Sequence, residues 1–416
     1  MGRPQKASVA VAVCICLGER HWQHQSIRVS PLHVQSQKDG FLLMHKLSGI
    51  GDIERLEYLV HSTERDLKPV QTSDHALIAL LYPAMLSGRA LHFEGVVTDQ
   101  LLFQIKHDVM PLLAARDERL QPIEITAAGQ TPAAAGAAAS DVGTGYSAGV
   151  DSFATLQLYS EAHAPASHRI SHIALFQNTQ TATGGFLDGM VARAEDYSAL
   201  KGLPLSKVSS NIEAVISAVE TLGRAESYRQ SHSLRSAASA SCLASGLRRY
   251  VFSGSYDYRL VTVAQTVDVA YVDPMLMPLL STAAFEFVSG CAGMRRFDKT
   301  LLVADNAEAW KHLHVCIRRT GAADSQTKGR GRADFINCSS CWKCVRTIFT
   351  LELEGKLERF GAVFDLALFE RSRKDVVKNL RHRAKMGDGQ AVDVLAYAET
   401  KGGLNAFYAR KLQLGS

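Results

Sequence analysis

In the middle of the chain, short apolar runs alternate with longer segments whose hydrophobic residues repeat at helical spacing. Four runs have the length and side-chain content of strands: residues 142–146, 170–176, 205–208 and 250–253. Between them, the apolar positions from Ile212 to Val219 follow the i, i+3, i+4, i+7 pattern of a helix, and residues 233–247 form a helical segment of small side chains. This alternation predicts an α/β fold with a doubly wound parallel sheet.

In the residues before 142, the predicted strands and helices do not alternate regularly. Strands are predicted at 7–17, 26–35 and 91–97, and helices are predicted to begin at Asp74 and at Thr98 or Asp99, the first of them ending at Gly88. These segments indicate an N-terminal α+β domain over residues 1–126. The Ala-rich stretch 127–141 predicts a linker. An α/β domain over 142–360 and a basic helical region over 361–416 complete the predicted organisation.

Composition narrows the class of protein without fixing a function. A chain of 416 residues is long enough for about two domains, and a net charge of +5 permits an anionic ligand without requiring one. Arg3 and Lys6 followed by the apolar run 7–17 imitate a signal peptide, but no small-residue cleavage site follows. We interpret this run as a buried strand and expect a cytoplasmic protein with no membrane partner.

The stretch from Tyr146 to Ser152 joins a predicted strand to a predicted helix, with Asp151 and Ser152 expected to cap the helix. Backbone N–H groups in such a loop, together with the helix dipole, attract an anion. Ser147 and Ser152 add hydroxyl donors, and Asp151 can hold Mg²⁺ beside bound phosphates. The chain contains no G-x-x-x-x-G-K-[ST] motif, so this is not a Walker loop. An ordinary Gly/Ser turn is the alternative interpretation.

Ligands of doubly wound sheets bind at the carboxyl ends of the strands. The segments that follow three of the predicted strands are Ser147–Ser152, Gln177–Asn178 and Gly254–Tyr258. We therefore expect these segments to converge on one crevice.

Half of the eight cysteines have the spacing of a metal site. Cys338, Cys341 and Cys344 are separated by two residues each, and Cys316 lies 22 positions before Cys338. This pattern favours a closed, tetrahedral and structural Zn²⁺ site. An iron–sulfur cluster is the main alternative. The other four, Cys14, Cys16, Cys242 and Cys291, are expected to be small core residues.

The loop resembles the S-G-G-x-D-S loop of the PP-loop ATP pyrophosphatases (adenine nucleotide alpha hydrolase-like), with Ala148 in place of the first glycine. Together with the C-x-x-C-x-x-C segment and the upstream cysteine, the chain resembles the QueC family of 7-cyano-7-deazaguanine synthases. Arg235 falls where that family has an arginine on a helix, and residues 252–259 and 274–282, with Glu286, are similar to two further family segments. The similarity covers residues 141–360. Larger QueC-like proteins carry N-terminal extensions, and some belong to antiphage operons (Qat and type IV CBASS).

This resemblance implies an ATP-dependent C–N ligase. Such an enzyme adenylates the carboxylate of a 7-deazaguanine-like substrate, releases pyrophosphate and forms an amide or nitrile, or a conjugate with a partner protein amine. The implied cofactors are ATP, Mg²⁺ and Zn²⁺. The implied catalytic residues are Ser147, Asp151, Ser152 and Arg235. The implied nucleotide-binding residues are Ser147, Ala148, Gly149, Val150, Asp151, Ser152, Gln177, Gly254 and Asp257. Arg235 has the alternative of a surface arginine, and Asp257 that of a turn aspartate.

Two other functions remain open at this point. A sulfur transferase on the same fold would make a thioamide or a thiolated base, and it would need an exposed cysteine outside the metal set. A non-catalytic nucleotide-binding module would follow if the Ala148 methyl group disabled the loop. The basic segments 318–332 and 371–385 offer surface to a partner protein from the same operon or to nucleic acid. Solvated charge is the favoured interpretation of both.

Overall fold

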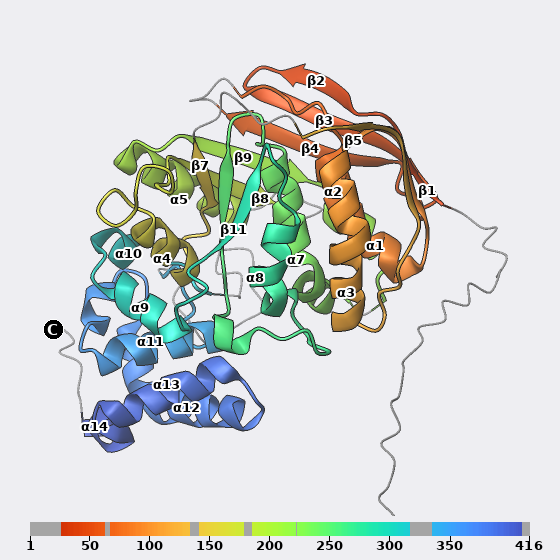
Figure 1. Cartoon of the computed structure of the whole chain (residues 1–416). Coiled ribbons are helices and arrows are strands. Elements are labelled where there is room, and N and C mark those ends of the chain that lie inside the picture. The colour runs from red at the N-terminus through yellow and green to blue at the C-terminus, as the bar shows by residue number, and fades with distance from the viewer. Residues whose placement is uncertain are drawn as a thin grey trace, which may run out of the picture.

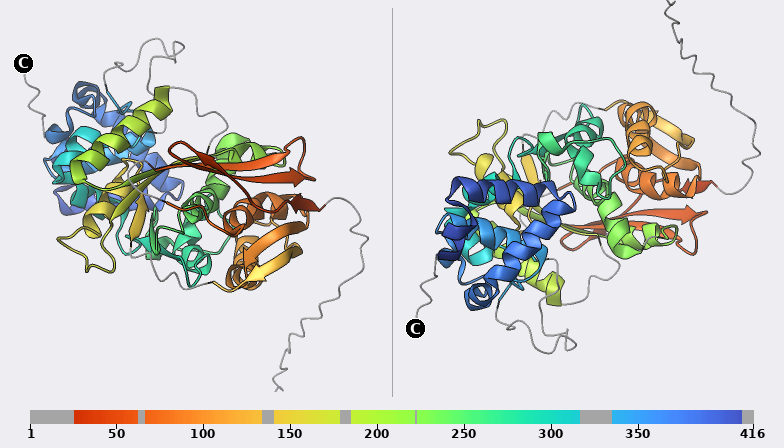
Figure 2. Two further views of the ribbon diagram at one scale, coloured as in Figure 1. Left: turned by 90° about the horizontal axis from the view of Figure 1, so that it is seen from above. Right: turned by 90° about the horizontal axis from the view of Figure 1, so that it is seen from below.

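The computed structural model describes residues 26–62, 67–133, 141–178, 185–221, 223–316 and 335–409. The predicted strand at 7–17 and the basic segment 318–332 lie outside these residues. The described part is an α/β structure built on one mixed, mostly parallel sheet of 11 strands (Figure 1). The N-terminal strands and the C-terminal helices lie at opposite ends of the molecule (Figures 1 and 2).

The predicted α/β part supplies five parallel strands. In spatial order they are β11 (Glu286–Gly290), β10 (Arg249–Ser253), β7 (Val142–Gly145), β8 (His172–Gln177) and β9 (Leu205–Ser210). The chain runs outward from β7 to β9 and then returns to β10 on the other side of β7. The order of the strands therefore reverses between β7 and β10, which is where open α/β sheets bind their ligands.

Helices cover both faces of this parallel part, and a separate hydrophobic core lies under each set. One core includes residues of α6 (Ile212–Ser217), α7 (Arg224–Ser241) and α8 (Asp273–Leu279), and the other includes residues of α4 (Val150–Leu158), α5 (Gly185–Lys201) and α9 (Arg296–Ala304). This arrangement agrees with the predicted doubly wound architecture. The sheet as a whole is nevertheless mixed, since its N-terminal strands include antiparallel pairs.

The predicted N-terminal domain shares the same sheet. β4 (Arg55–Ser62) pairs antiparallel with β9, and the sheet then continues through β3 (Gly40–Ser48), β1 (Ile27–Val29), β5 (Leu91–Thr98) and β6 (Ile125–Thr131), with β2 (His33–Gln37) beside β3. Residues 127–131, predicted to be linker, are thus part of a strand. Their small side chains allow close pairing with β5, so low complexity did not indicate an absence of structure here.

Several predicted elements are confirmed and others are divided. The strand predicted at 26–35 is two strands, β1 and β2. α1 (Asp74–Ser87) ends at Gly88, whose φ of 63° is the left-handed C-cap that glycine favours. The helix predicted from Thr98 consists of α2 (Asp99–Gln104), a π-helical turn (Ile105–Val109) and α3 (Met110–Arg116).

The C-terminal part is helical, as predicted. The predicted region 361–416 contains α12 (Leu366–Lys385), α13 (Gly389–Thr400) and α14 (Gly403–Ala409), and the helices α10 (Ala307–His312) and α11 (Trp342–Leu353) precede it in the predicted α/β part. The basic residues of α12 are mostly exposed, but Arg373 is buried and paired with Glu352 at 2.7 Å. Within the described ranges, no helix has the length and apolar character needed to cross a membrane.

The pairing of β4 with β9 depends on a side chain as well as on the backbone. Asn211, at the N-cap position of α6, makes no side-chain cap bond; its Oδ1 accepts from the Glu57 amide and its Nδ2 donates to the Arg55 carbonyl, both at 2.9 Å. Asn211 therefore fastens the N-terminal strands to the parallel part.

We predict that Asn211→Ala lowers the free energy of unfolding by about 2 kcal/mol, because two backbone groups of β4 lose their partner. Asn379→Ala is the matched control, since Asn379 is exposed in the middle of α12 and its removal should change the value by less than about 0.5 kcal/mol. Urea denaturation measures both. Equal effects of the two substitutions would contradict the role given to Asn211.

Candidate functional site

The loop between β7 and α4 ends in an open helix N-terminus. Gly149 occupies the N-cap position without a side-chain cap bond, so the predicted capping by Asp151 and Ser152 is wrong. The Phe153 amide donates to the Gly149 carbonyl at 3.0 Å, and the amides before it have no acceptor within the helix. The Ser147 hydroxyl accepts from the Gly149 amide at 3.3 Å. Ser152 is buried, and its hydroxyl has no hydrogen-bond partner.

Ala148 adopts the backbone conformation for which glycine is normally used. Its φ is 55°, its side chain is buried, and its carbonyl accepts from the His314 amide at 2.8 Å. A left-handed conformation costs an alanine about 1 kcal/mol relative to its relaxed state. The chain therefore keeps the glycine-type geometry of the loop in spite of the Ala148 methyl group.

The Asp151 carboxylate lies against two basic side chains of α9. It accepts a hydrogen bond from Arg296, and its Oδ1 is 3.5 Å from the Lys299 Nζ. Both cations are buried, whereas Asp151 retains 20% of its side-chain exposure. Burial raises the pKa of Asp151, but Arg296, Lys299 and Arg346 outweigh this effect and hold its pKa below the usual value. Asp151 is thus a counter-ion to these cations, and its Oδ1, which makes no hydrogen bond, is the carboxylate oxygen that would hold Mg²⁺.

Helix α11 brings two more basic side chains, those of Lys343 and Arg346, close to Arg296 and Asp151. Arg346 is buried, its guanidinium lies 4.4 Å from the Trp342 ring centroid, and its Nε and Nη1 have no hydrogen-bond partner. Burial and the neighbouring Arg296 lower the pKa of Arg346 to about 9, and burial and Arg346 lower the pKa of Lys343 to about 8. We call Arg296, Lys299, Lys343 and Arg346 the cation cluster. Its unpartnered N–H groups and excess charge are complementary to an anion with several oxygens.

Two of the other predicted nucleotide-binding residues border the loop strand. The Gly254 carbonyl, just after β10, accepts from Lys299 Nζ at 2.6 Å and so touches the cation cluster. Gln177 is the last residue of β8, the strand next to β7. Val150 is fully buried in α4, so only its backbone is available to a ligand. Together with the loop, these residues lie at the carboxyl ends of β7, β8 and β10, as predicted.

Asp257 and Arg235 have their charges neutralised elsewhere. Asp257 is buried and binds Arg259 at 2.7 Å, and Arg259 also binds Asp393 of α13. Arg235 lies on α7, as predicted, but it is buried rather than on the surface. Its guanidinium donates to Ser231 and Ser227 and lies 4.0 Å from Glu213. Within the described part of the chain, no hydrogen bond or ion pair joins the Arg235 side chain to the loop.

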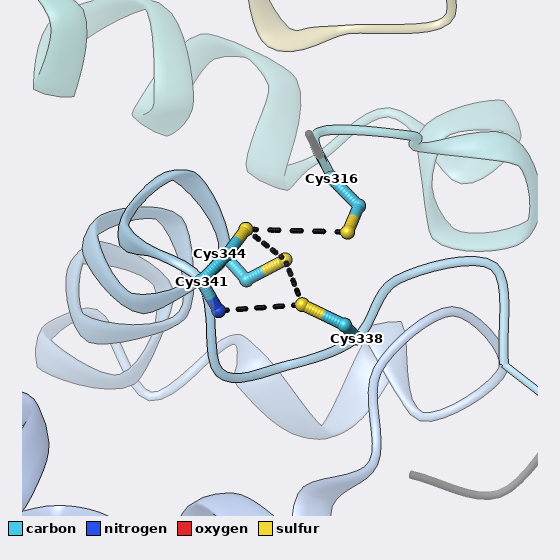
Figure 3. A group of neighbouring side chains, drawn as sticks. All are labelled: Cys316, Cys338, Cys341 and Cys344. Atoms are coloured by element: carbon cyan, nitrogen blue, oxygen red, sulfur yellow. Dashed lines mark hydrogen bonds between the residues drawn. The ribbon is translucent and has the colours of Figure 1, made fainter. Parts of the chain in front are cut away.

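The four predicted metal ligands form a compact group (Figure 3). Their sulfur atoms all lie within 4.8 Å of one another, and the separations include 3.4 Å for Cys341–Cys344, 3.9 Å for Cys338–Cys344 and 4.0 Å for Cys316–Cys341. Ligands on one tetrahedral ion, with metal–sulfur bonds of about 2.3 Å, have sulfur atoms about 3.8 Å apart. The group can therefore hold one metal ion.

Asn337 connects this group to the loop. Its Oδ1 accepts from the amides of Val315 and Cys316 at 2.8 and 3.1 Å, and its Nδ2 donates to the carbonyls of Leu313 and Val363 at 2.7 and 3.1 Å. The same short segment carries His314, whose amide binds the Ala148 carbonyl. α11 begins directly after Cys341, so the cysteine group also fixes the helix that carries Lys343 and Arg346.

The cation cluster was not predicted from the sequence. Arg296 and Lys299 follow β11, and the alternation of Phe285 and Phe287, followed by Gly290, was the signal that a further strand ends there. Lys343 and Arg346 lie beside the cysteines in sequence, but only folding brings α11 to the loop. Because these positions belong to separate elements, no local motif identifies them as one site.

Comparisons of the chain with protein-family models, with curated proteins and with solved structures found no match. The resemblance to the QueC family therefore depends on the motifs of the loop and of the cysteine segment.

We predict that Ala148→Gly leaves the free energy of unfolding unchanged or raises it by up to about 1 kcal/mol, because glycine relieves the left-handed strain. Ala154→Gly in α4 is the control, and it should lower the value by at least about 1 kcal/mol because Ala154 is buried in regular helix. Chemical denaturation compares the two variants. A similar loss for both would mean that the alanine conformation at 148 is unstrained.

Proposed function

We propose that this protein is an ATP-dependent C–N ligase. It adenylates the carboxylate of a 7-deazaguanine-like substrate, releases pyrophosphate and joins the activated acyl group to an amine. The observation that supports this most directly is the cation cluster, whose Arg346 has unpartnered N–H groups. It lies beside the open N-terminus of α4, where the strand order reverses. A triphosphate supplies the oxygen atoms and negative charge that this arrangement lacks.

Each step assigns work to residues of this chain. In the first step a carboxylate oxygen bonds to the α-phosphorus, and the bond to the bridging oxygen breaks, so pyrophosphate leaves with the electron pair. The cation cluster and the free amides of α4 stabilise the charge that develops on this leaving group. In the second step the amine nitrogen bonds to the acyl carbon, AMP leaves and the nitrogen loses a proton. The Ser147 and Ser152 hydroxyls are further donors to phosphate oxygens.

The basic side chains of the cation cluster also affect whether the site needs Mg²⁺. Mg²⁺ normally reaches a phosphate site through a carboxylate and the phosphates themselves. Here Arg296 hydrogen-bonds one oxygen of the Asp151 carboxylate, the other oxygen, Oδ1, makes no hydrogen bond and would be the atom that holds Mg²⁺, and the four basic side chains of the cation cluster lie beside it. We therefore assign neutralisation of the leaving group to the basic side chains.

We further propose that Cys316, Cys338, Cys341 and Cys344 hold one structural zinc ion. The sulfur separations fit a single tetrahedral ion, whereas an iron–sulfur cluster binds its cysteines through separate iron atoms and needs them further apart. With four thiolates bound, no position is left for substrate. The zinc ion would hold α11, and with it Arg346, against the loop.

The alternative of a sulfur transferase gains no support from the described cysteines. It requires a reactive, accessible thiol. Outside the metal group, the cysteines within the described ranges are Cys242 and Cys291, and both are buried. The remaining alternative, a nucleotide-binding module without catalysis, differs from the proposal in releasing no pyrophosphate.

We expect the purified protein to be colourless and to contain one zinc per chain by elemental analysis. Asn337→Asp should lower the zinc content and the melting temperature together, because the carboxylate replaces the amide donor to Leu313 and Val363 and adds a buried charge. Asn306→Asp is the control, since the Asn306 side chain only accepts bonds at the start of α10. Iron in the protein, with visible absorbance, would contradict the zinc assignment.

Substitutions of two buried arginines on neighbouring helices should distinguish an effect on pyrophosphate release from an effect on stability. Arg346→Met should reduce pyrophosphate release from ATP and 7-carboxy-7-deazaguanine on the order of a hundredfold, while stability is unchanged or higher because an uncompensated buried cation is removed. Arg373→Met should leave the rate unchanged and lower stability by about 3 kcal/mol, since Arg373 is paired with Glu352 and Glu370. Release of phosphate without AMP and pyrophosphate by the unmodified protein would contradict the proposed function.

A further inference from the structure

Helix α12 carries a row of basic residues that the proposed function does not use. One side of this helix packs on the protein through buried apolar side chains, which include Phe369, Val376 and Leu380. On the other side, exposed basic residues recur at alternating intervals of three and four positions, a spacing that places side chains on one face of a helix. They are Arg371, Lys374, Lys378, Arg381 and Lys385. We call these five residues the basic stripe.

The basic stripe is a narrow line of positive charge. With 3.6 residues per turn, its five positions fall within an arc of about 80°, and the helix rises about 21 Å from Arg371 to Lys385. α12 belongs to the C-terminal helices, which lie at the end of the molecule away from the N-terminal strands (Figure 1). Attraction to the helix dipole explains Lys385 in the last turn but not the four residues before it.

The charge of the basic stripe is not neutralised by the rest of the described chain. Within the described ranges, no ion pair or hydrogen bond involves the side chain of any of its five residues. The acidic groups nearest in sequence are paired with other arginines: Glu370 with Arg373 at 2.8 Å and Asp388 with Arg383 at 2.7 Å. Asp375 is the one exposed acidic residue of α12. The basic stripe is therefore available to an external polyanion.

The side chains around the basic stripe distinguish between classes of anionic partner. A helix that binds a lipid surface inserts its apolar face into the membrane, but the apolar face of α12 is buried against the protein. A protein partner is held mainly by apolar and aromatic anchors, and a single nucleic-acid strand stacks its bases on aromatic rings. The exposed residues between Arg371 and Lys385 are all charged or polar and offer neither kind of contact. A partner that presents only phosphate groups fits this surface best.

We propose that the basic stripe binds the phosphate backbone of double-stranded DNA. Lysine and arginine side chains that neutralise phosphates release counterions, and this supplies affinity without reading the base sequence. The major groove of B-form DNA, about 12 Å wide, admits an α-helix, whereas the major groove of an RNA duplex is deep and narrow. None of the five residues belongs to the loop or to the cation cluster. The inference is therefore independent of the proposed function.

Fluorescence anisotropy of a labelled DNA duplex of mixed sequence, titrated with the full chain at several KCl concentrations, tests the inference. Neutralisation of five phosphates should give a slope of about −4.5 when the logarithm of the binding constant is plotted against the logarithm of the salt concentration. Lys374→Gln combined with Lys378→Gln should reduce the size of this slope by about 1.8 and weaken binding at physiological salt by at least about tenfold. Both side chains are exposed, so the melting temperature should stay the same.

Lys38→Gln combined with Lys46→Gln is the matched control, because it removes the same charge from exposed positions beside and within β3. It should leave the slope and the affinity unchanged. Equal losses in the two double variants would indicate general attraction to a positively charged protein and would overturn the inference. Tighter binding of an RNA duplex or of a single strand would also overturn it, as would displacement of the DNA by polyglutamate as effectively as by unlabelled duplex. If the unmodified protein shows no saturable binding at physiological salt, the basic stripe is solvated charge.

Discussion

The site depends on a balance of charge at the end of β7. A single carboxylate, that of Asp151, contacts Arg296 and Lys299, and a third cation, Arg346, lies near enough to lower its pKa. Taking basic groups out of water costs several kcal/mol each unless opposite charge or hydrogen bonds compensate. Asp151, together with Asp268 near Lys343 and Asp388 near Arg346, leaves N–H groups of Arg296 and Arg346 without hydrogen-bond partners, so an anionic ligand can still improve the balance. Stability and ligand affinity are linked in such a site.

The cysteine group holds the loop and the basic side chains of α11 in position relative to each other. The segment 313–316 binds the loop through the His314 amide and reaches the cysteine group at Cys316. α11 leaves the same group and carries Lys343 and Arg346 back to the loop. Metal binding and folding are coupled in sites of this kind. A change in the cysteine group would therefore displace the basic side chains before it affected the sheet, and the two motifs recognised in the sequence act as one unit.

The features that could be predicted from the sequence are those whose signal lies within a few consecutive residues. The loop at 147–152, the four cysteines and the strands β7, β8, β9 and β10 have local signatures, and the structure places them as expected. The cation cluster has no such signature because α9 and α11 contribute to it through tertiary packing. The β3–β4 hairpin was missed, and the end of β6 was taken for linker, because pairing with a neighbouring strand outweighed weak local preferences there. Arg235 shows the converse: a helix position was predicted correctly, but its environment was not.

The junction between β4 and β9 has a consequence for the synthesis of the protein. Glu57 and its partner Asn211 are separated by 154 positions, so at 5–20 residues per second the ribosome needs about 8 to 30 s to supply the second strand after the first. During this interval β4 is an unpaired sheet edge, of the kind that joins other chains. The nascent N-terminal region can complete its own hairpins, but it has to wait with one edge open. Chaperones that bind exposed strands would act on this protein before the loop and the cation cluster come together.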